Sequence, residues 1–215
     1  MEEQKQLIAE TGRGIMEKGL TWGTSGNISI REKDRVWITA SGTVMGELKD
    51  EDILVCDLEG NLLEGTKKPS KETAMHLNVY RKRPDIGGIV HCSPFYGTMC
   101  ACADISLQTD LFIESMYYDA DIQYIPYHHA GSRELAEAVK AAAGVANVIF
   151  MRNHGLLTFD YNLKEALFAM EITEQMCKMN IISKMGGFAL KEVPQEIVRN
   201  FLDGGYYKKR KPHVS

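Results

Sequence analysis

The spacing of strand-like segments along the chain restricts the possible folds more than any other feature of the sequence. Near the N-terminus these segments come in pairs around short polar turns, as in β-hairpins. The pairs are residues 28–30 with 36–39, and residues 53–58 with 62–63. Later apolar runs, at residues 86–90, 145–152 and 156–159, alternate with helical patterns. The mixture predicts an α/β fold with a mixed sheet covered by helices, rather than a purely alternating βαβ fold.

Apolar residues at helical spacing predict the helices that would cover this sheet. A first helix is expected over residues 3–19, and further helices over about 70–83, 132–143, 163–184 and 197–202. Ser132 is the expected N-cap of the third of these helices. No repeat or low-complexity linker divides the 215 residues. We therefore expect one domain over residues 1–215, with a polar C-terminal tail from about residue 203.

Composition argues against several classes of partner and location. The net charge of −4 gives no general attraction to nucleic acid or to an anionic membrane. No stretch approaches the roughly 18 apolar residues of a membrane span, and the charged N-terminus does not resemble a signal peptide. Five cysteines without disulfide-like spacing favour a reducing, cytoplasmic location. The basic run at residues 208–211 is interpreted as part of a solvated tail.

Three turns carry groups suited to binding an anion. They are residues 24–27, which include Gly26 and Asn27, then Ser41 with Gly42, and Ser70 with Lys71 at the start of a predicted helix. Helix N-termini and exposed backbone amides attract phosphate groups, and Lys71 adds a positive charge. Each turn by itself is typical of an ordinary loop, so only their combination predicts a phosphate site.

Two histidines and one glutamate form a candidate metal site. His91 and His154 stand at the ends of predicted strands, and Glu72 stands at the head of a predicted helix. Imidazole and carboxylate groups are common ligands of zinc and other divalent ions. A single histidine at a strand end is more typical of a satisfied polar residue. The hypothesis therefore requires the three side chains to meet in space.

The order of these motifs resembles that of the class II aldolase family, which includes L-fuculose-phosphate aldolase and L-ribulose-5-phosphate 4-epimerase. The resemblance covers about residues 5–185. Its motifs are Gly26-Asn27-Ile28-Ser29, Ser41-Gly42, Pro69-Ser70-Lys71-Glu72, Arg83-Pro84-Asp85, Ile89-Val90-His91, residues 131–136 and Asn153-His154-Gly155-Leu156. The resemblance implies a three-layer αβα sandwich around a mostly antiparallel central sheet. It also implies a homotetramer with active sites between subunits.

The same resemblance assigns roles to the candidate residues. The turns with Gly26, Asn27, Ser41, Gly42, Ser70 and Lys71 are similar to the family's phosphate-binding turns. Glu72 resembles its acid/base carboxylate, which also reaches the metal, and His91 and His154 resemble two of three metal-binding histidines. The implied activity is metal-assisted retro-aldol cleavage of a small phosphorylated ketose through an enediolate, with zinc as the expected ion.

One position departs from the family pattern. Ser93 stands where the family usually has a second strand histidine, two residues after the first. Serine is a poor zinc ligand, so three outcomes are open. Glu72, His91 and His154 hold the ion together with water; Cys92, His128 or His129 replaces the missing ligand; or the site has lost its metal. The alternatives to an aldolase are an epimerase or a decarboxylase on the same scaffold, or a non-catalytic family member.

A tyrosine from a neighbouring subunit is the proton donor in some family aldolases. Ser115 aligns near that position here, with Tyr117 and Tyr118 close by. Tyr206 and Tyr207 lie in the segment that resembles the family's C-terminal tail. His76, one helical turn after Glu72, is interpreted as a packing residue or as a support behind the metal ligands.

Overall fold

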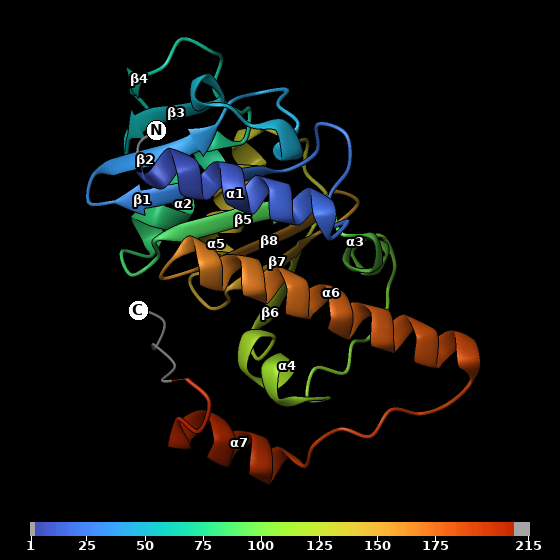
Figure 1. The fold of residues 1–215 in the computed structure, drawn as a ribbon. Coiled ribbons are helices and arrows are strands. Elements are labelled where there is room, and N and C mark those ends of the chain that lie inside the picture. Colours follow the sequence, from blue (N-terminus) through green and yellow to red (C-terminus); the bar gives the residue numbers. More distant parts are fainter. Residues whose placement is uncertain (1–2, 209–215) are drawn as a thin grey trace.

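Eight strands form one sheet in the order β4-β3-β2-β1-β5-β8-β7-β6 (Figure 1). The structure, a computed structural model, describes residues 3–208. Only β6 and β7 pair in parallel among these strands, so the sheet is mostly antiparallel, as the family resemblance implied. The strands are β1 (Asn27–Glu32), β2 (Arg35–Thr39), β3 (Ile53–Asp57), β4 (Leu62–Glu64), β5 (Gly88–Cys92), β6 (Ile122–Ile125), β7 (Val148–Met151) and β8 (Gly155–Asp160).

Helices cover both faces of this sheet. They are α1 (Glu3–Glu17), α2 (Thr73–Lys82), α3 (Phe95–Cys102), α4 (Ile113–Tyr118), α5 (Arg133–Ala143), α6 (Leu163–Gly186) and α7 (Gln195–Gly204), with short 3₁₀ turns at Met45–Glu47 and Asp50–Asp52. One apolar core joins the sheet to α1, α3 and α6, and a second joins it to α2 and α5. Figure 1 shows α1 and α6 in front of the sheet and α2 and α5 behind it. The expected three-layer αβα sandwich is confirmed.

The alternation of side chains along β5 assigns its residues to the two cores. Val90 and Cys92 pack in the core beneath α1 and α6, and Ile89 packs in the core on the α2 side. Because successive side chains of a strand point to opposite faces, His91 faces the α2 side together with Ile89. Glu72 immediately precedes α2, so the strand and the helix deliver these two side chains to the same side of the sheet.

Local signals account for two of the helix ends. The hydroxyl of Ser132 accepts a hydrogen bond from the Leu135 amide at 3.1 Å, which confirms the expected N-cap of α5. Helix α1 ends earlier than expected because Gly19 adopts a left-handed conformation with φ of 66°. The amide of Leu20 then bonds back to the Ile15 carbonyl at 2.9 Å. This turn directs the chain into the loop before β1, which lines the pocket described below.

The structure differs from the sequence analysis in two regions. No element was predicted between residues 91 and 131, where α3, α4 and β6 are found. Lys208 is partly exposed but does not extend freely into solvent: its Nζ lies 2.6 Å from Glu165 Oε2 and 2.6 Å from the Tyr118 hydroxyl. Residues 209–211, the rest of that basic run, lie outside the described residues. No helix within residues 3–208 has both the length and the apolar character of a membrane span.

Candidate active site and metal centre

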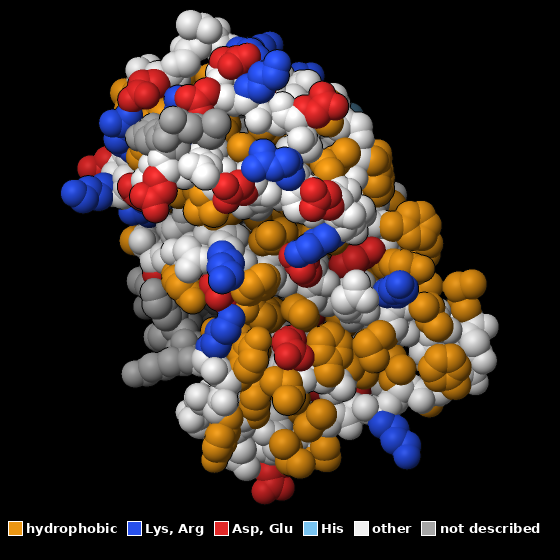
Figure 2. Space-filling view, viewed as in Figure 1, with side chains coloured by type: hydrophobic (Ala, Val, Ile, Leu, Met, Phe, Trp, Pro, Cys, Tyr) orange, Lys and Arg blue, Asp and Glu red, His pale blue; other side chains and the backbone are white. Residues whose placement is uncertain are grey.

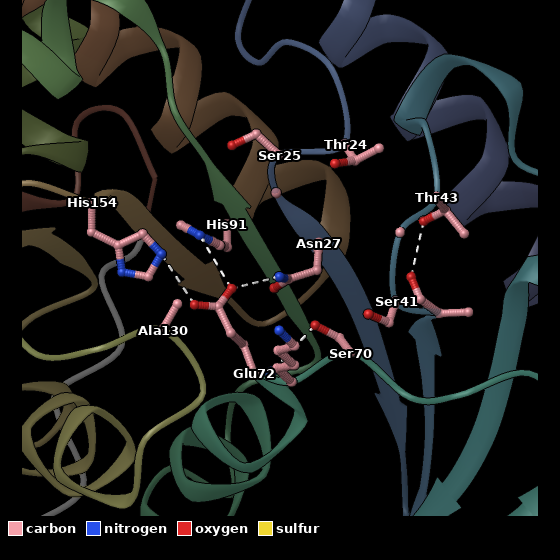
Figure 3. Close-up of a pocket in the computed structure, with 14 residues that line it drawn as sticks. Thr24, Ser25, Asn27, Ser41, Thr43, Ser70, Glu72, His91, Ala130 and His154 are labelled. Carbon is pink, nitrogen blue, oxygen red and sulfur yellow. Dashed lines mark hydrogen bonds and ion pairs between the residues drawn. The ribbon is translucent and has the colours of Figure 1, made fainter.

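A pocket of about 300 Å³ opens at one end of the central strands (Figure 3). All nine residues that the sequence analysis assigned to the phosphate and metal sites contribute to its wall. These residues are Gly26, Asn27, Ser41, Gly42, Ser70, Lys71, Glu72, His91 and His154. Thr24, Ser25, Ala40, Thr43 and Ala130 complete the lining. Thr24 and Ser25 belong to the predicted turn at residues 24–27, and Thr43 directly follows the predicted Ser41-Gly42 turn.

Strand pairing explains why residues far apart in the sequence meet here. The antiparallel register of β1 and β5 places Asn27 directly opposite His91. On the other side of β5, His91 lies opposite Leu157 of β8, and His154 stands in the turn just before that strand. Glu72 enters from the start of α2. The side chains therefore converge because the sheet register is fixed by the apolar residues on its two buried faces.

Two glycines allow the segments before β1 and at the start of β8 to pack directly against the backbone of β5. Gly26 has φ of 90° and Gly155 has φ of 157°, values that side chains rarely adopt. A Cβ on Gly26 would lie 2.6 Å from the His91 carbonyl oxygen, and one on Gly155 would lie 2.6 Å from the Cys92 carbonyl oxygen. A larger residue at either position would push a wall of the pocket away from His91.

Glu72, His91 and His154 form a compact group of possible metal ligands. Glu72 Oε1 lies 3.1 Å from His154 Nε2, and Glu72 Oε2 lies 3.4 Å from His91 Nε2. One ligand atom from each residue lies within 4.8 Å of the others. The two imidazole rings are 4.9 Å apart between centroids and nearly perpendicular. The convergence that the metal hypothesis required is therefore found.

The hydrogen bonds of this group suit a divalent cation. His91 Nδ1–H donates to the Leu156 carbonyl at 2.8 Å, which leaves the lone pair of Nε2 directed toward Glu72. Glu72 Oε1 is buried and makes no well-aligned hydrogen bond among the described residues, although His154 Nε2 lies 3.1 Å away. A buried carboxylate oxygen without a well-aligned donor, beside two imidazole nitrogens, is an arrangement that a divalent ion would satisfy. The residues present therefore fit the metal that the family resemblance implied.

Burial and partners act in opposite directions on these charges. Burial alone would raise the pKa of Glu72, but His91, His154 and the Asn27 amide outweigh it and hold this pKa well below its ordinary value. Burial lowers the pKa of His91, against the attraction of Glu72. The site therefore combines an ionised carboxylate with a neutral imidazole, which are the forms that ligate a metal.

The substitutes considered for the missing histidine do not join this group within the described chain. Cys92 was an alternative donor, but it is buried in the core on the opposite face of β5. His129 bonds instead to the Tyr127 hydroxyl at 3.0 Å, and its loop reaches the pocket through Ala130. Ser93 Oγ lies 3.2 Å from Ser25 Oγ and 3.4 Å from the His154 carbonyl oxygen, so Ser93 supports the neighbouring turns.

The candidate tyrosines lie away from the pocket. No tyrosine within residues 3–208 lines it. Ser115 caps the start of α4, and the Tyr118 hydroxyl donates to Glu165 at 2.7 Å. Tyr117 packs against Tyr207 with a ring separation of 5.4 Å. A single chain therefore offers no phenol to this site from its described residues.

His76, interpreted from the sequence as a packing or supporting residue, lies directly behind the pocket. Its side chain is fully buried and hydrogen-bonds to Asn27 on one side and to Ser29 on the other. Burial lowers the pKa of His76 to about 3, so the ring is neutral. Ser29 and Tyr80, which continue this contact, were not predicted from the sequence because neither reaches the pocket wall.

Comparison with known proteins assigns the chain to a family. The model described as "Class II Aldolase and Adducin N-terminal domain" matches residues 6–181. The chain belongs to the class II aldolase family. L-fuculose phosphate aldolase of Methanococcus maripaludis is 38% identical over 160 residues, which cover 74% of this chain and 86% of that protein.

Two further class II aldolase relatives extend the comparison. A 3-oxo-tetronate 4-phosphate decarboxylase of Haemophilus influenzae is 37% identical over 82% of this chain and 86% of its own length. The solved structure of an L-fuculose 1-phosphate aldolase superposes with a TM-score of 0.87 at 31% identity, covering 96% of this chain and 98% of that one. The predicted family, fold and aldolase-type lyase activity are confirmed.

Proposed function

We propose that this class II aldolase cleaves a small phosphorylated ketose by a metal-assisted retro-aldol reaction. The observation that carries the proposal is the shared pocket, in which anion-binding turns face a carboxylate and two imidazoles. A pocket of about 300 Å³ suits a small sugar phosphate. Relatives named for the cleavage of L-fuculose phosphate support this substrate class.

The phosphate is proposed to bind the three glycine- and serine-containing turns. The backbone amides of Gly26, Gly42 and Lys71 donate to no backbone carbonyl within residues 3–208, and all three residues line the pocket. The hydroxyls of Ser41 and Ser70 lie beside them, and Lys71 supplies positive charge. Amides, hydroxyls and an ammonium group together form the usual surroundings of a bound phosphate.

Glu72, His91 and His154 are proposed to hold the divalent ion. Such an ion would draw electron density from the substrate carbonyl and stabilise the negative charge of the enediolate. We propose zinc because the family resemblance implies it. Two imidazoles and one carboxylate also accept manganese, iron or cobalt, so zinc must be tested against these ions.

Glu72 is proposed to move the proton. In a retro-aldol step, the hydroxyl on the carbon that becomes the aldehyde loses its proton, and the adjacent C–C bond breaks. The electron pair of that bond passes to the ketone fragment as an enediolate, which later takes up a proton on carbon. Glu72 is ionised and borders the pocket, so it can accept the hydroxyl proton.

We propose that a tyrosine from a neighbouring copy of the chain acts as a further proton donor. The assembly would be a cytoplasmic homotetramer with active sites at subunit interfaces. The pocket receives no phenol from the described part of its own chain. Exposed apolar side chains of α3 and α6, including Phe95, Met99 and Ile182, offer a surface for association. Figure 2 shows apolar side chains gathered over the region of α4 and α6. All five cysteines are free thiols, consistent with a reducing compartment.

A screen of ketose 1-phosphates tests the proposal. The purified protein is incubated with each substrate and with zinc, manganese or cobalt, and aldehyde release is measured before and after treatment with a chelator. We expect cleavage of at least one substrate, loss of activity on chelation, and recovery with one preferred ion. Cleavage unaffected by exhaustive chelation, or absent with every ketose phosphate and ion, would contradict the proposal.

Decarboxylation is a second candidate because of the Haemophilus influenzae relative. Loss of carbon dioxide from a 3-oxo acid also leaves an enolate, which the same metal site could stabilise. The two reactions differ in their product, so the screen should include a phosphorylated 3-oxo acid and measure carbon dioxide. A kcat/KM at least about tenfold higher for that substrate would favour the decarboxylase.

A further inference from the structure

Behind the pocket, four buried side chains form a continuous series of short hydrogen bonds that ends at Glu72. Asn27 Nδ2 donates to Glu72 Oε2 at 2.8 Å, and Asn27 Oδ1 lies 2.6 Å from His76 Nε2. His76 Nδ1 lies 2.7 Å from Ser29 Oγ, which lies 2.8 Å from the Tyr80 hydroxyl. All four side chains are buried, so water does not compete for these bonds.

The acceptor at one end determines the direction of every bond in the series. An ionised carboxylate only accepts hydrogen bonds, so Asn27 must direct its NH₂ group toward Glu72 and its oxygen toward His76. His76 must then carry its proton on Nε2. The lone pair on Nδ1 accepts from the Ser29 hydroxyl, and Ser29 in turn accepts from Tyr80. No other assignment of these hydrogens satisfies the four contacts with His76 neutral.

We propose that His76 is a positioning residue, which fixes the orientation of the Asn27 amide and thereby holds Glu72 toward His91 and His154. This inference rests on the proposed role of Glu72 as a metal ligand. If the Asn27 amide rotated by half a turn, its oxygen would face the carboxylate and repel it. The Nε2–H group of His76 opposes that rotation because it requires an acceptor.

The same orientation determines what Asn27 offers to a ligand. Asn27 lines the pocket, and its oxygen is already used by His76. The second N–H of the amide has no partner among the described residues. Asn27 therefore presents a donor to the pocket, which suits an anionic substrate better than an acceptor does. Without His76, the Asn27 amide could present either its oxygen or its NH₂ group to the pocket. With His76 in place it presents the NH₂ group, which favours a negatively charged ligand.

A matched pair of substitutions at His76 tests the role. In His76→Gln the side-chain amide can place a donor near the position of Nε2, whereas in His76→Asn the shorter side chain cannot reach Asn27. We expect His76→Asn to weaken the affinity for zinc by about 10- to 100-fold, the usual cost of losing a group that orients a metal ligand. His76→Gln should remain within about fivefold of the unmodified protein. Affinity is measured by competition with a chromophoric chelator.

The assigned tautomer provides a second measurement, which needs neither metal nor substrate. In protein labelled with ¹⁵N-histidine, the His76 signals, identified by their loss in His76→Gln, should show a protonated Nε2 and an unprotonated Nδ1. Ser29→Ala removes the donor to Nδ1 and should increase the share of the other tautomer. This smaller substitution also serves if His76→Asn does not fold.

The outcomes separate this inference from the proposed function. An Nδ1-protonated His76, or equal zinc affinity in the His76→Asn and His76→Gln proteins, would overturn the positioning role. Equal losses of affinity that parallel equal losses in unfolding temperature would likewise overturn it, because they would indicate packing alone. If the tautomer and affinities are as expected but no ketose phosphate is cleaved, the positioning role stands and only the proposed reaction fails.

Discussion

Two buried carboxyl groups in this protein have opposite electrostatic environments. Glu72 is 7% exposed and Asp119, at the end of α4, is 1% exposed. Glu72 accepts from Asn27 and faces two imidazoles, so its pKa lies well below the ordinary value. Asp119 accepts one bond from Thr173 of α6, and burial raises its pKa to about 7. Similar burial therefore produces opposite shifts, and the partners decide which one is observed.

The surroundings of the two groups differ in the same way. Glu72 borders a cavity lined by amides, hydroxyls and Lys71, so its charge is available to a ligand. Asp119 Oδ2 is buried without a hydrogen-bond partner among the described residues, and Asp119 does not line the pocket at Glu72. A strongly shifted pKa by itself therefore does not identify an active site in this fold. The combination of shift, converging donors and an open pocket does.

Glu72→Gln should give the largest effect. The substitution keeps the shape of the side chain but removes its charge and its capacity to accept a proton. We expect kcat for the preferred substrate to fall by at least about 10³-fold, since both proton transfer and metal binding depend on this group. Steady-state kinetics at saturating metal measure the change. Asp119→Asn is the control carboxyl substitution and should leave kcat unchanged; equal losses in the two variants would remove the distinction.

His154→Ala should have the next largest effect. It leaves the proposed ion with Glu72 and His91 as its protein ligands. We expect zinc affinity to fall by about 100-fold or more, with the unfolding temperature of the metal-free protein nearly unchanged because the side chain is partly exposed. Chelator competition and a thermal melt give the two numbers. His128→Ala, at a half-buried histidine that does not line the pocket, is a matched control and should bind zinc normally. Unchanged affinity in His154→Ala would exclude His154 as a ligand.

Asp119→Asn should remove the part of the pH dependence of stability that Asp119 contributes. The folded protein keeps the Asp119 proton up to a pH of about 7, whereas the ordinary pKa of the unfolded group is 3.8. Stability from this group is therefore greatest below about pH 4 and is lost as the pH rises to about 7. At pH 8 the asparagine variant should be more stable by roughly 2–3 kcal/mol, and at pH 4 nearly equal. Denaturant unfolding at both pH values tests the sign, and a variant that is less stable at pH 8 would contradict it.

Lys208→Met should have the smallest effect. Lys208 bonds to Glu165 and Tyr118 near the C-terminal end of the described chain, but its side chain is 30% exposed. Because such ion pairs contribute little, we expect a loss of about 1 kcal/mol or less and unchanged zinc affinity. A denaturation curve and a zinc titration provide the comparison. A large loss of zinc affinity would indicate that this cluster is coupled to the pocket.

Parts of the fold with local causes were predictable from the sequence. The turn at Lys33 and Asp34 joins β1 to β2, and Ser132 caps α5, because a few neighbouring residues determine each of these features. Helix α3 was not predicted. Its residues Gly97, Cys100 and Ala101 are buried against the rest of the protein, and its sequence is apolar with no polar stripe to mark a helical period. Strand β6 has four residues and pairs in parallel with β7, so the sequence contains no hairpin turn that would predict it.

In the candidate site, too, the residue types were predictable from the sequence, whereas their contacts depend on strand pairing. Glu72, His91 and His154 were selected through residue type and the order of motifs, and their convergence became visible only through the pairing of β1, β5 and β8. The sequence indicated a packing or supporting role for His76, but its partner could not be predicted, because the contact depends on a strand register that places Asn27 within reach of both His76 and Glu72. Contacts of this kind arise from the whole sheet and have no short-range signal.

The distribution of the proposed ligands along the chain has a consequence for assembly. Between Glu72 and His154 the chain forms α2, β5, α3, α4, β6, α5 and β7. An ion coordinated by both residues would act as a reversible cross-link that closes a long loop of polypeptide. If the ion stayed bound to both residues in the unfolded chain, it would lower the entropy of that chain. Binding of such an ion would therefore require Glu72, His91 and His154 to have been brought together, and a fragment of the chain without one of these residues would lack the complete site.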